Sequence, residues 1–185
     1  NDILRRENEF MKIFVTGVNG QLGHDVMNEL AKRGYEGIGS DLAPAYSGIA
    51  DDSAVTTMPY VALDITDEQA VQQTISRIHP DAVIHCAAWT AVDMAEDDDN
   101  VAKVRAVNAD GTQHIASACK AVDCKMVYIS TDYVFDGQGT TPWQPDCKDY
   151  KPLNVYGQTK LEGELAVAHT LEKYFIVRIA WVFGQ

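Results

Sequence analysis

The sequence predicts an α/β fold in which a doubly wound, mostly parallel sheet lies between two layers of helices. Short apolar runs alternate with amphipathic stretches from Met11 onwards, the pattern of parallel strands joined by crossover helices. The run 82–86 is apolar, as expected for a strand buried on both faces. The 185 residues are 46% hydrophobic, enough for the core of one domain, and no internal repeat divides them.

The expected strands and helices follow one another along the chain. Thr66 followed by Gln69 predicts a capping box at the start of the second helix. Gly34 and Pro80 mark the ends of the first and second helices. The expected strands cover residues 12–16, 37–41, 60–63, 82–86, 125–130 and 174–180. The expected helices cover residues 22–31, 66–78, about 99–122 and 154–171.

Composition and charge exclude several classes of function. The chain has 27 acidic and 15 basic residues, a formal net charge of −12, and no basic cluster that would neutralise nucleic-acid phosphates. Its most apolar stretch, 82–92, is far shorter than the roughly 20 residues of a membrane span. We therefore expect neither nucleic acid nor membrane as a partner. Residues 1–10 are charged and lack the apolar centre of a secretory signal, so we expect a disordered leader or residues left by cloning.

The cysteines, acidic residues and histidines give no strong metal signal. The cysteines show no Cys-x-x-Cys spacing, so we expect reduced thiols in a cytoplasmic protein, with a metal site as the alternative. The acidic run 96–99 precedes the long helix, where carboxylates stabilise the positive end of the helix dipole. His85 falls in a buried strand and is expected to be a hydrogen-bonded core residue. The cysteines are Cys86, Cys119, Cys124 and Cys147.

A glycine-rich turn joins the first strand to the first helix. It reads Thr16-Gly17-Val18-Asn19-Gly20-Gln21-Leu22-Gly23. The first glycine permits a tight turn, the second lets a pyrophosphate approach the backbone, and the third lets the helix pack closely on the strand. The helix N-terminus then offers unpaired N–H groups and the positive end of its dipole to the phosphates. This pattern predicts the dinucleotide-binding turn of a Rossmann domain.

Asp41 lies at the end of the second expected strand, 24 residues after Gly17. A carboxylate at this place usually accepts hydrogen bonds from the adenosine ribose, which favours NAD over NADP. No arginine follows closely to hold a 2′-phosphate, so the residues favour NADH without excluding NADPH. The alternative is a loop carboxylate that caps a turn near Pro44.

Three side chains suggest proton transfer to a carbonyl oxygen. Tyr156 and Lys160 are four residues apart on an expected helix, so both lie on one face. A neighbouring ammonium lowers the pKa of a phenol, which is ordinarily near 10, so the tyrosine can act as a general acid. Thr131 lies at the carboxyl end of the fifth expected strand, where its hydroxyl can bond the same oxygen. Ser130 is the competing hydroxyl, and a turn cap is the alternative role for Thr131.

These motifs resemble those of the extended short-chain dehydrogenase/reductases. The shared features are the glycine turn, Ala87-Ala88 after an apolar strand, and Tyr-x-x-x-Lys. Four longer stretches are similar to the dTDP-4-dehydrorhamnose reductase family, and the match covers residues 11–185. These stretches are GQLG at 20–23, AVDMAE at 91–96, STDYVFDG at 130–137 and PLNVYG at 152–157.

The resemblance implies hydride transfer from NADPH or NADH to the C4 ketone of the nucleotide sugar dTDP-4-dehydro-L-rhamnose, giving dTDP-L-rhamnose. It implies that Tyr156 protonates the developing alkoxide and that Thr131 fixes the ketone. Lys160 would lower the pKa of the tyrosine and hold the nicotinamide ribose. Further cofactor contacts would be Asp64, Ile65, Ala87 and Ala88, and substrate contacts Val92 and Trp181, with core packing as the alternative for Trp181.

The family continues past the matched region into a smaller substrate-binding lobe. We therefore expect residues 11–185 to form the NAD(P)-binding Rossmann domain with that lobe largely absent, and to bind cofactor but turn over poorly. One alternative is a sugar-nucleotide epimerase or dehydratase, although related dehydratases carry Asp-Glu where this chain has Asp132-Tyr133. The other is a non-catalytic, NADP-binding regulatory subunit similar to that of methionine adenosyltransferase. The amphipathic helices are also suited to pairing in a homodimer.

Overall fold

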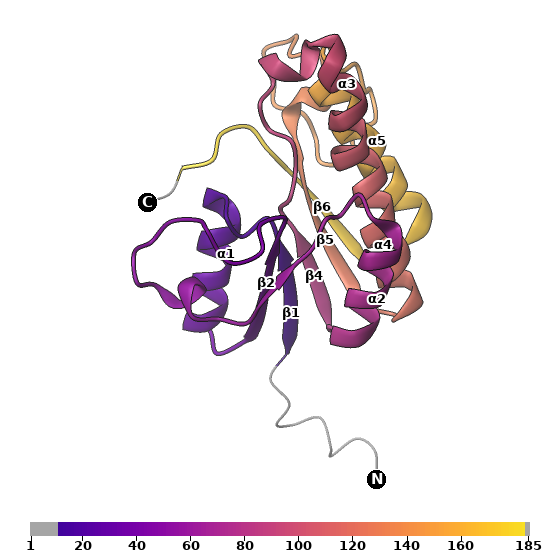
Figure 1. The fold of residues 1–185 in the computed structure, drawn as a ribbon. Coiled ribbons are helices and arrows are strands. Elements are labelled where there is room, and N and C mark those ends of the chain that lie inside the picture. Colours follow the sequence, from indigo (N-terminus) through magenta and orange to yellow (C-terminus); the bar gives the residue numbers. More distant parts are fainter. Residues whose placement is uncertain (1–10, 184–185) are drawn as a thin grey trace.

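The computed structural model describes residues 11–183, so the expected leader at 1–10 lies outside the described residues. Six parallel strands form one sheet in the order β3-β2-β1-β4-β5-β6 (Figure 1). This order confirms the doubly wound α/β fold, and its reversal between β1 and β4 opens a crevice at their carboxyl ends. The strands are β1 (Lys12–Thr16), β2 (Glu36–Asp41), β3 (Tyr60–Ala62), β4 (Ala82–His85), β5 (Lys125–Thr131) and β6 (Tyr174–Ile179).

Helices cover both faces of the sheet, which gives the three expected layers. In Figure 1, α1 (Gln21–Lys32) lies on one side of the sheet, and α2 (Glu68–Ile78), α4 (Gly111–Ala121) and α5 (Val155–Thr170) lie on the other. The helix α3 (Asp98–Arg105) rises beyond the strand ends. Short 3-10 turns cover Ala54–Thr56, Asp93–Glu96 and Asp132–Val134. Among these helices none is long and apolar enough to cross a membrane.

Two apolar clusters hold the layers together, one on each face of the sheet. Successive side chains of a strand point to opposite faces, so Phe14 packs into the cluster with Ile115, while Val15 packs into the cluster with Met27. All four side chains are at most 1% exposed. The sheet is therefore fixed from both sides around β1, the strand that leads into the glycine turn.

The ends of the first two helices follow their local chemistry. Gly34 adopts a left-handed φ of 77° after α1, as expected for a stop signal. The predicted cap of α2 is wrong by one residue, because Asp67 rather than Thr66 caps the helix, accepting from the Ala70 N–H at 2.9 Å. Thr66 instead donates its hydroxyl to Asp64 at 2.7 Å.

The expected helix at 99–122 begins at Asp98 and is interrupted by a π-helical turn, Ala106–Asp110. Asp98 and Asp99 lie in the first turn of α3, as the dipole interpretation predicted. The same interpretation is wrong for Glu96. Its carboxylate accepts the Val155 N–H at 2.6 Å and so lies at the N-terminus of α5 instead.

Candidate active site

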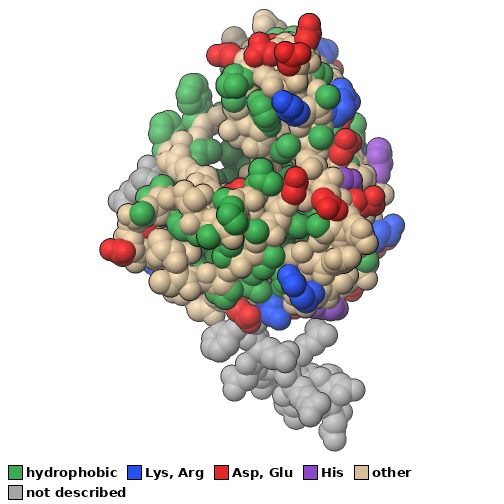
Figure 2. Space-filling model, in the orientation of Figure 1, with side chains coloured by type: hydrophobic (Ala, Val, Ile, Leu, Met, Phe, Trp, Pro, Cys, Tyr) green, Lys and Arg blue, Asp and Glu red, His purple; other side chains and the backbone are tan. Residues whose placement is uncertain are grey.

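A cleft of about 730 Å³ lies along the carboxyl ends of the strands. In Figure 2 the surface is hollowed above the body of the domain, with hydrophobic side chains gathered around the opening. The structure brings every site residue expected from the sequence into the lining of this cleft. These residues are Gly17, Gly20, Gln21, Leu22, Gly23, Asp41, Asp64, Ile65, Ala87, Ala88, Val92, Thr131, Tyr156, Lys160 and Trp181.

The glycine turn is shaped by close backbone packing. Gly17 has a left-handed φ of 76°, and a Cβ there would lie 2.6 Å from the Ala87 nitrogen. A Cβ on Gly23 would collide with the carbonyl oxygen of Gly17. Gly20 precedes α1, and no side chain caps the helix there. The uncapped N-terminus of α1 therefore opens onto the cleft, where it suits an anion such as a pyrophosphate.

A buried hydrogen-bond chain ties the ends of β1 and β4 together beneath the turn. His85 is 1% exposed, and its Nδ1 lies 2.7 Å from the Thr16 hydroxyl and its Nε2 3.1 Å from the Thr112 hydroxyl. Since Thr112 donates its hydrogen to the carbonyl of Asn108, it can only accept from Nε2–H, so Nδ1 accepts from Thr16. The Thr16 oxygen in turn accepts the Ala87 N–H at 3.2 Å. This confirms His85 as a hydrogen-bonded core residue.

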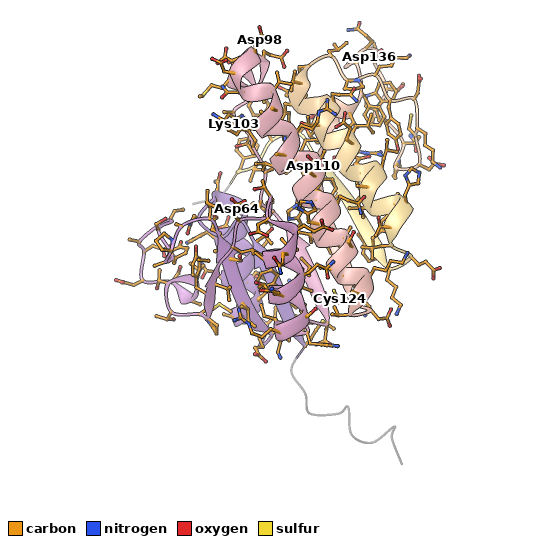
Figure 3. The ribbon with its side chains drawn as sticks, turned by 45° about the vertical axis from the view of Figure 1, so that its right-hand side comes forward. Asp64, Asp98, Lys103, Asp110, Cys124 and Asp136 are labelled. Atoms are coloured by element: carbon orange, nitrogen blue, oxygen red, sulfur yellow. The ribbon has the colours of Figure 1, made fainter. Side chains whose placement is uncertain are left out.

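Two carboxylates line the cleft after β2 and β3. Asp41 accepts the N–H groups of Asn19 at 3.0 Å and Leu42 at 2.8 Å, so it stabilises the glycine turn while facing the cleft. The alternative expected from the sequence, a loop carboxylate that caps a turn near Pro44, is wrong, because Asp41 ends β2 and bonds to Asn19 of the glycine turn. Asp64 lies where the chain leaves β3, at the end of the sheet opposite Cys124 (Figure 3).

Thr131 and Tyr156 both line the cleft. Burial raises the pKa of the Tyr156 phenol, while the neighbouring Thr131 hydroxyl opposes the rise. Ser130 also lines the cleft, and its hydroxyl is buried without a hydrogen-bond partner, so the choice of Thr131 over Ser130 stays a prediction. Thr131 also accepts the Tyr133 N–H at 3.2 Å, so the turn-cap role is present as well. The Tyr133 ring meets the Tyr156 ring edge-on, with centroids 5.8 Å apart.

The expected lowering of the Tyr156 pKa by Lys160 is wrong for this structure. The Lys160 amine donates to the carbonyl of Ile129 at 2.7 Å and lies 4.2 Å from the centroid of the Tyr128 ring. Burial also lowers the pKa of Lys160 to about 7, so part of its population is neutral at neutral pH. With the amine engaged there, burial sets the direction of the Tyr156 pKa shift.

The cleft also contains residues that the sequence motifs did not single out. Each of them lies at a strand end or in the segment that follows, where ligands of parallel sheets bind. These additional lining residues include Ser40, Leu42, Cys86, Trp89, Thr90 and Tyr133. Trp181 is 82% exposed, so it does not pack in the core formed by residues 11–183. Within residues 11–183 no group of three or more His, Cys, Asp or Glu side chains could hold a metal ion.

The parallel sheet, the glycine turn at its switch point and the Thr-Tyr-Lys group define a Rossmann-type domain of the short-chain dehydrogenase/reductase superfamily. Residues 11–185 match the RmlD substrate binding domain, and the chain belongs to that family.

Named relatives agree with this assignment. A dTDP-4-dehydrorhamnose reductase of Streptomyces griseus is 40% identical over 171 residues, which are 92% of this chain and 49% of the relative. Crystal structures of such reductases from Clostridium acetobutylicum and, with NADP, from Bacillus anthracis superpose with TM-scores of 0.80 and 0.77. They are 38% and 36% identical, and the alignments cover 94% and 96% of this chain and 55% and 56% of theirs. The chain spans about half the length of the curated relatives it matches.

Proposed function

We propose that this chain supplies the cofactor site and the proton donor of a dTDP-4-dehydrorhamnose reductase. The reaction is NAD(P)H-dependent reduction of the C4 ketone of dTDP-4-dehydro-L-rhamnose to dTDP-L-rhamnose. The observation that carries the proposal is the single cleft that contains both the glycine turn and the Thr131–Tyr156 pair. Relatives that carry this activity by name match almost the whole chain.

The cleft fits a nicotinamide dinucleotide on two independent grounds. The uncapped N-terminus of α1 suits a pyrophosphate, and Gly17 and Gly23 leave no room for side chains there. The hydroxyls of Ser40 and Ser130 are buried in the cleft lining without partners, which suits ligand groups that form hydrogen bonds. Asp41 and Asp64 would hold the adenosine end, with Ile65, Ala87 and Ala88 along the path of the cofactor.

The reduced nicotinamide, when bound, supplies the hydride, and the side chains of the chain supply the rest. Thr131 would orient the ketone oxygen, and Tyr156 would donate its proton to that oxygen as negative charge develops. Burial alone makes the phenol a weaker acid, so its proton donation would depend on a cation close to it. Lys160 would leave the Ile129 carbonyl to contact the nicotinamide ribose and the phenol. Val92 and Trp181 would contact the nucleotide sugar.

A hydride-transfer assay tests the proposal. The chain is offered dTDP-4-dehydrorhamnose with NADPH or NADH in separate reactions, alone and joined to the remaining part of the Streptomyces griseus relative. We expect cofactor binding but slow turnover for the chain alone, and faster turnover for the joined form, because a loosely held ketone is reduced slowly. Failure of either cofactor to bind, or of the joined form to oxidise it, would contradict the proposal. Rapid turnover by the 185 residues alone would contradict the expected need for further residues.

The remaining expectations on location and assembly belong to this proposal. A cytoplasmic location suits the cysteines of the described segment, which are free thiols. The expected homodimer remains a prediction, and sedimentation of the purified chain would test it.

A further inference from the structure

The helix that carries the proton donor also carries a buried carboxylate, which is ion-paired and has no part in the proposed chemistry. Glu164 on α5 is 2% exposed and is held by Arg178 on β6. The Arg178 Nε donates to one carboxylate oxygen at 2.8 Å, and Nη2 donates to the other at 2.7 Å. Both oxygens of the carboxylate are therefore occupied by one guanidinium, the geometry of a bidentate pair.

The pair lies directly along the helix from the active site. Tyr156, Lys160 and Glu164 follow one another at intervals of four residues, so they share one face of α5. Despite this closeness, the Lys160 amine is held by the Ile129 carbonyl and the Tyr128 ring rather than by the Glu164 carboxylate. The amine thus remains at the cleft, where it is part of the lining.

The nearby carboxylate would otherwise compete for that amine. A buried carboxylate that loses its partner is strongly destabilised and attracts any cation within reach. Lys160 is such a cation, since a lysine side chain is long and its ammonium is a mobile point charge. Without the guanidinium of Arg178, the amine would turn along the helix towards Glu164 and away from the cleft.

Arg178 also contacts the connection that leads from Thr131 to Tyr156. Its Nη2 donates to the Tyr150 hydroxyl at 3.1 Å, and its guanidinium carbon lies 5.3 Å from the centroid of the Tyr150 ring. The same carbon lies 5.2 Å from the centroid of the Phe135 ring. In the sheet Arg178 pairs with Ser130, the residue before Thr131. One side chain therefore joins β5, the connection after it and α5.

We propose that Arg178 is a positioning residue of the active site, which occupies both oxygens of Glu164 and so leaves the Lys160 amine free to act in the cleft. The inference rests on the proposed function, because it concerns the amine of that site. Its consequence is that the Glu164 carboxylate attracts the Lys160 amine more strongly when Arg178 is absent.

The test follows cofactor binding by the 185-residue chain as a function of pH. The dissociation constants of NADH and NADPH are measured by nicotinamide fluorescence from pH 6 to pH 10, and the tighter cofactor is followed. In the unmodified chain we expect an inflection near the pKa of Lys160, about 7, because binding favours the charged amine. The titratable groups that face this amine are Cys86, His85, Tyr128, Tyr156 and Glu164.

Substitution of Arg178 by methionine leaves Glu164 buried beside Lys160 and favours the ammonium. We expect Arg178→Met to move the inflection upwards by roughly one to three pH units, the usual effect of an opposite charge within a few ångströms. The double variant Glu164→Gln/Arg178→Met removes both charges and should bring the inflection back down to that of the unmodified chain or below it, because the Glu164 charge already raises the pKa of Lys160 when Arg178 is present. Arg178→Lys, which keeps the charge, should give a smaller shift and serves if Arg178→Met does not fold.

A matched control breaks a different ion pair on the same helix. Arg105 pairs with Glu162 of α5 at the exposed side, so Arg105→Met should leave the inflection unchanged. A purely structural role for Arg178 would lower thermal stability without moving the inflection, and that result would overturn the inference. Failure of the double variant to bring the inflection back down would overturn it as well. If the unmodified chain binds neither cofactor, the proposed function fails with it, whereas binding without a shift defeats the inference alone.

Discussion

Gly20 offers the sharpest separation of folding from cofactor binding. The residue lies before α1 with φ −86° and ψ 163°, an extended conformation that any residue can adopt. A Cβ added there would meet one atom within 4 Å, the carbonyl oxygen of Gly17 at 3.5 Å, which is an ordinary contact. Because Gly20 lines the cleft, the methyl group of an alanine would occupy space at the proposed pyrophosphate site.

The expected effects on stability and on affinity differ in size. Gly20→Ala costs at most about 1 kcal/mol at the helix cap, and a stiffer unfolded chain returns roughly 0.4–1 kcal/mol. The free energy of unfolding should therefore change little. Loss of one charge-assisted hydrogen bond to a phosphate costs about 1.5–3 kcal/mol, so cofactor binding should weaken by roughly 10- to 100-fold.

Two other glycines, one within α1 and one just after it, supply controls. Gly34→Ala lies beyond the far end of α1 at a left-handed φ of 77°, with no atom within 4 Å of the added Cβ. It should cost about 1–2 kcal/mol of stability and leave binding unchanged. Gly23→Ala places its Cβ 2.7 Å from the Val18 Cα, so the turn cannot keep its shape and folding should suffer.

Thermal unfolding and fluorescence titration with NADPH and NADH measure both quantities for each variant. Binding of cofactor by Gly20→Ala as tightly as by the unmodified chain would contradict a pyrophosphate site at Gly20. Binding weakened as much by Gly34→Ala as by Gly20→Ala would contradict it too, because the effect would then come from stability alone.

Four further substitutions test other parts of the site. Tyr156→Phe should abolish ketone reduction by the chain joined to the remaining part of the Streptomyces griseus relative, because the proton donor is lost. Cofactor affinity should stay within about twofold, and substrate and cofactor titrations of each form check both results. Lys160→Met should raise the thermal unfolding temperature of the chain without cofactor, because it removes a buried amine. The same substitution should weaken cofactor binding, and melting and titration experiments on each variant measure the two effects. Burial lowers the pKa of His85 to about 3, so as the pH falls the unfolded chain binds a proton at His85 before the folded chain does. The free energy of unfolding should therefore fall by roughly 1.5–2 kcal/mol from pH 6.5 to pH 5, and urea titrations should show a smaller fall for His85→Phe. Asp41→Ser should improve the affinity for NADPH relative to NADH, measured as the ratio of the two dissociation constants, because a carboxylate repels a 2′-phosphate.

Much of the fold is predictable because it depends on patterns local to the chain. The alternation of Phe14 and Val15 between two faces, and the glycine spacing after them, are readable without any tertiary contact. The cap of α2 shows the limit of such patterns. Thr66 and Asp67 are both suitable caps, and the choice depends on the bond between Thr66 and Asp64, which spacing does not reveal.

The site is predictable in its membership but not in its electrostatics. Strand ends and helix spacing identify Thr131, Tyr156 and Lys160, because parallel strands bring their carboxyl ends to one edge. The state of Lys160 depends instead on burial and on a carbonyl 31 residues away in the sequence. The bond from Val155 to Glu96 spans 59 residues, so sequence spacing placed Glu96 at the wrong helix.

A crystal structure of the 185-residue chain with NADPH or NADH tests the central claim most directly. The account predicts the pyrophosphate over Gly17 and Gly20, the adenosine beside Asp41, and the nicotinamide ring next to Thr131 and Tyr156. It also predicts that the Lys160 amine leaves the Ile129 carbonyl for the ribose of the nicotinamide. A cofactor bound in the reverse direction, or outside this cleft, would contradict the account.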